Sequence, residues 1–187
     1  AAFERTLLVN NSPFDRYMRG DRSAMTEEQV SGMQRFQRVG CIKCHNGPMF
    51  SDYKLHVMGV PDNPALPASD GGAQNSPCPA APQEPRTAAS RAGCDSYAFR
   101  TPSLRNVEFT FPYGHNGTFR TLRAVVGFYE STIAGSSRNP NVSYEELDPR
   151  LRELQNVDEE DVDLIEFLHA LSDDSFDRTI PERVPSG

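Results

Sequence analysis

Two cysteines and a histidine form the part of this sequence with the clearest chemistry, the run Cys41-Ile42-Lys43-Cys44-His45. Two thiols three positions apart can each form a thioether to one edge of a single porphyrin, and the adjacent imidazole is then placed to bind the iron. The alternatives are a buried cysteine pair beside a surface histidine, and a zinc site. The other cysteines, Cys78 and Cys94, lack the spacing of a second Cys-x-x-Cys pair. The motif therefore predicts one covalently attached haem c, with His45 as a ligand of the iron.

The composition of the 187-residue chain argues against several classes of partner. The formal net charge is −7 and no run is rich in Lys or Arg, so neither nucleic acid nor an anionic membrane surface is an expected partner. No apolar run approaches the roughly 20 residues of a membrane-spanning helix, so no membrane span is predicted. A c-type haem is normally attached outside the cytoplasm. We therefore expect a periplasmic protein whose export signal once preceded this sequence.

The second cysteine pair, Cys78 and Cys94, lies in a long stretch dense in Pro, Gly, Ala and Ser, residues 59–98. The sequence predicts this stretch to be irregular. In an oxidising compartment the two thiols are expected to form a disulfide, and two free thiols are the alternative. A loop of this length inside a compact domain is unusual unless it is functional or tied down, and the disulfide would tie it down.

Four segments are predicted to be helices and almost nothing is predicted to be a strand. The segments are residues 2–9, 26–39, 122–129 and 158–171. In the second, Thr26 and Gln29 form a capping-box pattern, and the helix leads directly to Cys41. In the fourth, acidic residues fill the expected first turn, where they match the helix dipole. The predicted fold class is mainly α, a cytochrome c-like haem domain with long irregular loops.

A second signature follows the Pro-rich stretch. It consists of FRTPSLRNV, which begins at Phe99, and TFPYGHNG, which begins at Thr110. The haem-motif segment, GCIKCHNGPMFSD, begins at Gly40. Together these segments resemble the bacterial di-haem cytochrome c peroxidases and their relatives of the MauG type. The opening of the chain is similar to the segment that joins the two haem domains of that family. The resemblance covers nearly the whole chain apart from a Pro-rich insertion, residues 61–97.

Members of that family have two haem domains, each with its own Cys-x-x-Cys-His motif, whereas this sequence has one. The resemblance implies that residues 1–25 are the interdomain helix and linker, and that residues 26–187 are the C-terminal c-type haem domain. The N-terminal haem domain, which meets peroxide in the family, is then an expected partner in the rest of a longer protein. A true single-haem relative is the alternative.

The resemblance also implies a sixth ligand for the haem iron. In typical peroxidases of the family this ligand is a Met fourteen residues after the His of the P-Y-x-H segment. Counted from His115, that position is Tyr129, and MauG-type enzymes also have Tyr there. A thioether favours Fe(II), whereas a phenolate oxygen favours higher oxidation states and suits peroxide-driven oxidation of a protein residue. The alternatives are that Tyr129 is a core aromatic, and that Met49 or Met58 is the ligand.

The remaining expectations concern three histidines and a calcium ion. The resemblance gives His115 a structural or electron-relay role near the interface between the haem domains. It also implies a calcium site there that uses the backbone carbonyls of Thr110 and Pro112, since carbonyl oxygens suit a hard cation such as Ca²⁺. His56 is expected to be a packed polar residue that could contact a haem propionate, and His169 a surface or cap residue.

The function implied by the resemblance is a di-haem peroxidase-type oxidoreductase, with Tyr129 and His115 as its candidate catalytic residues in this half. The haem of this chain would store and relay electrons while hydrogen peroxide reacts at the N-terminal haem. The substrate would be an electron-donor protein or a residue of a partner protein. With His45 and Tyr129 both bound to iron, this half alone offers peroxide no vacant position. The alternative function is a single-haem c-type electron-transfer protein without peroxidase activity.

Overall fold

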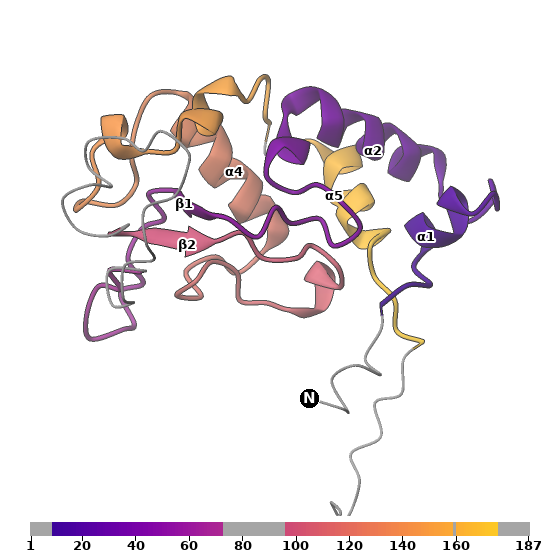
Figure 1. Ribbon diagram of the computed structural model, residues 1–187, viewed down its shortest axis with the longest axis horizontal. Helices are drawn as coiled ribbons and strands as arrows, with labels where there is room; N and C mark the ends of the chain where they lie inside the picture. Colours follow the sequence, from indigo (N-terminus) through magenta and orange to yellow (C-terminus); the bar gives the residue numbers. More distant parts are fainter. Residues whose placement is uncertain (1–8, 73–95, 159, 176–187) are drawn as a thin grey trace, which may run out of the picture.

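The computed structural model describes residues 9–72, 96–158 and 160–175 (Figure 1). Helices and irregular loops make up most of this part of the chain, with one sheet of two short strands, which confirms the predicted fold class. The expected disulfide between Cys78 and Cys94 lies outside the described residues, as does the helix expected at residues 2–9 except for its last residue.

Two helices that pack against each other form the centre of the core, α2 (Glu27–Val39) and α5 (Val162–His169) (Figure 1). The predicted capping box of α2 is present. The Gln29 amide donates to Thr26 Oγ1 at 3.2 Å, and the Thr26 amide donates to Gln29 Oε1 at 3.1 Å. Helix α5 begins four residues later than predicted. The carboxylate of Asp161 caps it by accepting from the Leu164 amide at 3.0 Å, which places the acidic run before the helix instead of in its first turn.

Helix α1 (Pro13–Met18) was not among the predicted helices, yet it is tied firmly to this core. The Phe14 amide donates to the Ala170 carbonyl at 3.0 Å. The ring of Phe14 meets Phe50 and Phe167 edge to face, with centroids 5.1 and 5.9 Å apart. A six-residue helix is too short to show a hydrophobic period, which explains why the sequence pattern missed it.

Helix α4 (Leu122–Ile133) extends four residues beyond its predicted end. Thr121 caps it by accepting from the Ala124 amide at 3.1 Å. The strands β1 (Leu55–Val57) and β2 (Ala98–Arg100) pair antiparallel (Figure 1). Three residues per strand are too few for an alternating pattern to be recognised in the sequence.

Short 3₁₀ helices complete the described secondary structure: η2 (Cys41–Lys43), η4 (Val107–Phe109), η5 (Tyr144–Glu146) and η6 (Pro149–Glu153). The buried apolar residues form two clusters. The larger surrounds α2 and α5, and the smaller consists of Val142, Leu147 and Leu151. Side chains of both clusters line one cavity, so the cavity lies between them. Among the helices that the structure describes, none is both long enough and apolar enough to cross a membrane.

Candidate haem site

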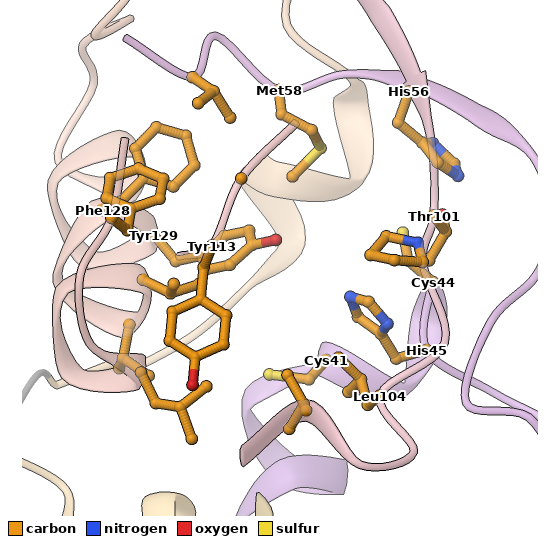
Figure 2. A pocket seen from close by; sticks show the side chains of 18 of the residues that line it. Cys41, Cys44, His45, His56, Met58, Thr101, Leu104, Tyr113, Phe128 and Tyr129 are labelled. Carbon is orange, nitrogen blue, oxygen red and sulfur yellow. The ribbon is translucent and has the colours of Figure 1, made fainter. Parts of the chain in front are cut away.

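The turn that carries the two cysteines follows directly from the end of α2. Gly40 adopts a left-handed conformation with φ +101°, ends the helix and sends the chain into η2. Within this turn the His45 amide donates to the Cys41 carbonyl at 2.9 Å, and the Cys44 amide donates to the same oxygen at 3.3 Å. Both thiols and the His45 ring are thereby held along one cavity (Figure 2).

The cavity has a volume of about 420 Å³, within the range of about 300–1,000 Å³ that is usual for cofactor and ligand sites. Three basic residues, Lys43, Arg100 and Arg150, are also among those that line it. A flat apolar ring with an anionic edge, such as a porphyrin with its propionates, matches this distribution. Much of the wall is apolar and comes from Phe36, Met58, Leu104, Val107, Phe119, Leu122, Val125, Val126, Phe128, Leu151, Leu154, Val157, Leu164 and Leu168.

Burial raises the pKa of the Cys41 thiol to about 12 and that of the Cys44 thiol to about 11. Both side chains are therefore protonated at neutral pH, and neither is the activated thiolate of a redox or catalytic cysteine. A pair of neutral thiols at the wall of an apolar cavity suits thioether attachment better than thiolate chemistry.

The imidazole of His45 is oriented by its own loop. Its Nδ1 lies 3.0 Å from the Phe50 carbonyl oxygen, so Nδ1 donates the hydrogen bond and Nε2 is left as the unprotonated nitrogen. Burial lowers the pKa of His45, which keeps the ring neutral. A neutral imidazole with a fixed tautomer and a free lone pair is the form that binds iron. Figure 2 shows this ring directed into the cavity.

Tyr129 enters the same cavity from α4, on the side away from His45 (Figure 2). Burial raises the pKa of its phenol, and the nearby Cys41 and Cys44 add to the effect. The hydroxyl therefore stays protonated unless a cation lies beside it. Met58 also points into the cavity, whereas Met49 is 40% exposed. Of the two methionines considered as iron ligands, Met58 is the one that lines the cavity.

Comparison with known proteins shows relatives along almost the entire chain, although no family model matches it. The cytochrome-c peroxidase IdrP1 of Pseudomonas sp. (strain SCT) is 37% identical over 188 residues, covering 92% of this chain and 48% of that protein. The methylamine utilization protein MauG of Methylorubrum extorquens is 32% identical over 183 residues, covering 97% of this chain and 45% of that protein. The chain belongs to the cytochrome c peroxidase and MauG family.

The fold supports this membership. The diheme peroxidase BthA from Burkholderia thailandensis matches with a TM-score of 0.61 at 26% identity, over 88% of this chain and 47% of that one. The chain spans about half the length of the curated relatives it matches. The resemblance read from the Cys-x-x-Cys-His and P-Y-x-H segments is therefore confirmed at the level of the family.

The other residues expected from the cytochrome c peroxidase and MauG family lie at the rim of the cavity. His115 is exposed and stacks on Phe99, with ring centroids 3.5 Å apart and planes 11° from parallel. Thr110 and Pro112 both line the cavity and are also exposed. The structure thus places His115, Thr110 and Pro112 at the same rim.

One group of side chains in this family member was not predicted as a unit. His56 is buried, and its two ring nitrogens lie 2.6 Å from Asp148 and 3.0 Å from Asp52. Both ring nitrogens thus have carboxylate partners, and the expected contact with a haem propionate stays a prediction. The sequence offered only the four-residue spacing of Asp52 and His56, since Asp148 lies 92 residues further along the chain. His169 is the last residue of α5, is half-buried, and its Nδ1 lies 3.4 Å from Glu166 Oε1.

Proposed function

We propose that this chain is the C-terminal, haem-bearing half of a periplasmic di-haem oxidoreductase that uses hydrogen peroxide. One observation carries the proposal. His45 and Tyr129 point into a single, mostly apolar cavity, with Cys41 and Cys44 beside it (Figure 2). That arrangement offers two attachment points and two axial ligands for one haem c.

Each side chain has a defined task in this proposal. Cys41 and Cys44 hold the cofactor by thioether bonds, and His45 binds through Nε2 because Phe50 holds its Nδ1. Tyr129 would supply the sixth ligand as a phenolate, with its proton passing to solvent. Such a haem supplies one-electron chemistry, and an oxygen ligand favours its oxidised states. The apolar residues around the ring exclude water and strengthen these electrostatic effects.

With His45 and Tyr129 as ligands, peroxide has no position to occupy at this haem. The proposal therefore assigns the reaction with peroxide to a second haem in an N-terminal domain of the whole protein, consistent with relatives about twice the length of this chain. The chain's own haem stores and relays electrons. His115, at the rim, serves as a relay or structural residue toward that domain, and the carbonyls of Thr110 and Pro112 contribute to a calcium site there.

The electrons come from a donor protein or from a residue of a partner protein, as in cytochrome c peroxidases and MauG respectively. A tyrosine ligand favours a residue of a partner protein as the source of electrons. It stabilises the oxidised haem and so makes the haem a poorer acceptor of electrons from ordinary cytochromes. A Met58 ligand would favour a donor protein, because a thioether raises the potential.

The first test is haem attachment. The full chain is exported to a bacterial periplasm with the c-type haem maturation system, and haem is counted by intact mass and by the pyridine haemochrome spectrum. One covalent haem is expected, and it should be lost in Cys41→Ser and Cys44→Ser. A Tyr129→Phe variant should change the ligand-sensitive optical bands, whereas the exposed Tyr53→Phe should not. Absence of covalent haem would refute the proposal.

The second test concerns the whole protein. The natively expressed protein should be about twice as long as this chain, carry two haems and turn over hydrogen peroxide. A native protein of this length with one haem and no turnover of peroxide would instead support the single-haem electron carrier.

A further inference from the structure

The backbone carbonyl that orients His45 belongs to a residue in an unusual conformation. Phe50 has φ +51°, in the left-handed region that a residue with a bulky side chain rarely adopts, and it is 8% exposed. In this conformation its carbonyl oxygen lies 3.0 Å from His45 Nδ1, while its ring packs in the larger core cluster. A residue persists in such a conformation only where its surroundings hold it there. The contacts that hold Phe50 therefore bear on the orientation of His45.

Three aromatic rings surround the ring of Phe50. Its centroid lies 5.1 Å from that of Phe14, 6.2 Å from that of Phe36 and 6.1 Å from that of Phe167, and all three pairs meet edge to face. Phe36 belongs to α2 and Phe167 to α5, whereas Phe14 belongs to α1, which precedes both helices along the chain (Figure 1). Part of the support of the Phe50 ring therefore comes from α1.

Arg105 holds the loop of Phe50 a second time. Its Nε donates to the Pro48 carbonyl at 2.6 Å, and its Nη1 and Nη2 donate to the two carboxylate oxygens of Asp15 at 2.8 and 2.9 Å. The side chains of this pair are only 9% and 11% exposed, and such a two-point contact fixes the direction of the guanidinium. The Cζ of Arg105 also lies 5.9 Å from the centroid of the Phe50 ring.

Both supports of this loop start from the same helix. Phe14 and Asp15 are consecutive residues of α1; the first packs on Phe50, and the second holds Arg105 against the loop. The position of Asp15 is itself fixed, because its Oδ2 also accepts from the amide of Ser12 at 3.1 Å and from the Ser12 hydroxyl at 2.7 Å. A displacement of α1 would therefore be transmitted to the Phe50 carbonyl. We refer to Phe14, Asp15, Phe50 and Arg105 as the clamp.

We propose that Arg105 and Phe50 are positioning residues for the haem, and that the clamp determines how strongly His45 donates its Nδ1 proton to the Phe50 carbonyl. A histidine that donates in this way is a more basic ligand and favours the oxidised iron. The clamp therefore lowers the midpoint potential of the haem, although none of its four side chains binds the iron.

This inference rests on the haem attachment in the proposed function, but not on the identity of the sixth ligand. Its observable is the midpoint potential of the haem. Loss of an outer hydrogen-bond partner typically weakens the affinity of a metal ligand by about 10- to 100-fold. A tenfold loss of the affinity of His45 for the oxidised iron alone corresponds to a rise of about 59 mV in the potential of a one-electron couple.

The test is a spectroelectrochemical titration of the haem-loaded full chain at one pH, with substitutions that leave the net charge unchanged. Arg105→Lys keeps a cation beside Asp15 but removes the Nε donor to Pro48 and the planar fork, so the potential should rise by about 59 mV. Phe14→Leu removes one ring from Phe50 and leaves the ion pair in place, so the potential should rise by a smaller amount.

Each substitution has a matched control that loses a similar contact elsewhere. Arg35→Lys alters an arginine of α2 whose Nε lies 2.5 Å from Asp161 Oδ2, a pair that joins α2 to the start of α5 instead of to the loop of Phe50. Tyr17→Leu alters a second partly buried aromatic residue of α1, whose ring centroid lies 4.6 Å from Arg22 Cζ. Both controls should leave the potential unchanged.

Two results would overturn the inference while the proposed function stands. One is a potential that stays the same or falls in Arg105→Lys or in Phe14→Leu, and the other is an equal rise in the two controls. If Arg105→Lys does not fold, Phe14→Leu decides alone, because it leaves the buried ion pair intact. Absence of covalent haem from the unaltered chain would overturn both proposals together.

Discussion

Replacing Gly32 with alanine should destabilise the protein at the contact between α2 and α5. A Cβ atom added at Gly32 would overlap the backbone carbonyl of Asp163 and lie 2.8 Å from the Phe167 Cβ. A backbone carbonyl cannot rotate away, so the two helices would have to move apart. Such overpacking costs about 3 kcal/mol at the upper end of its usual range, and alanine returns about 1 kcal/mol through its better helix propensity. We therefore expect a net loss of about 2 kcal/mol in the free energy of unfolding.

For a protein of this size that loss corresponds to a fall of about 4–8 °C in Tm. The measurement is urea and thermal unfolding followed by far-ultraviolet circular dichroism, on samples with equal haem content. Gln37→Ala is the matched control, because Gln37 lies on the exposed side of α2 and tests helix propensity without the contact. If Gly32→Ala were as stable as the unaltered protein, the close approach of α2 and α5 would be wrong.

Three further outcomes are expected. Arg105→Gln should cost about 3 kcal/mol, the lower end for a buried pair, because the side chains of Arg105 and Asp15 are only 9% and 11% exposed. Lys43→Gln should cost less than about 1 kcal/mol, because its ion pair with Glu153 is exposed. Urea unfolding measures both losses. Burial alone would raise the pKa of Asp15, but Arg105 helps to hold this pKa below its ordinary value of 3.8. The stability that this carboxylate contributes is present above pH 3.8 and is lost as the pH falls through the lower folded-state pKa. Acid unfolding below about pH 4 should therefore depend less on pH in Arg105→Gln than in the unaltered protein. Tyr129→Met should raise the midpoint potential of the haem, and an unchanged potential would count against Tyr129 as a ligand.

The parts of the structure that could be predicted are those whose signals are local in sequence. The capping box at Thr26 and the glycine at position 40 mark both ends of α2 within a few residues. The start of α5 could not be located in the same way. Its acidic run satisfies the helix dipole equally well inside or just before the helix, and the structure uses Asp161 as the cap.

The candidate site shows the same division between local and long-range information. Cys41, Cys44 and His45 are neighbours in sequence, so their chemistry could be predicted from their spacing alone. The position of Tyr129 opposite His45 could be expected only through the resemblance to a family. The contact between His56 and Asp148 depends on how β1 and η6 meet, and a single sequence carries no pattern for such a meeting.

The guanidinium of Arg105 determines how short this chain can be made. It donates to both carboxylate oxygens of Asp15 in α1, at 2.8 and 2.9 Å, and to the carbonyl of Pro48 at 2.6 Å, just beyond the Cys-x-x-Cys-His turn. A piece that starts at residue 26 would keep the haem motif but leave this cation buried without its counter-ion, and it would remove the Phe14 ring from the aromatic core. A dissection of the protein that aims at a folded haem unit should therefore cut before Ser12.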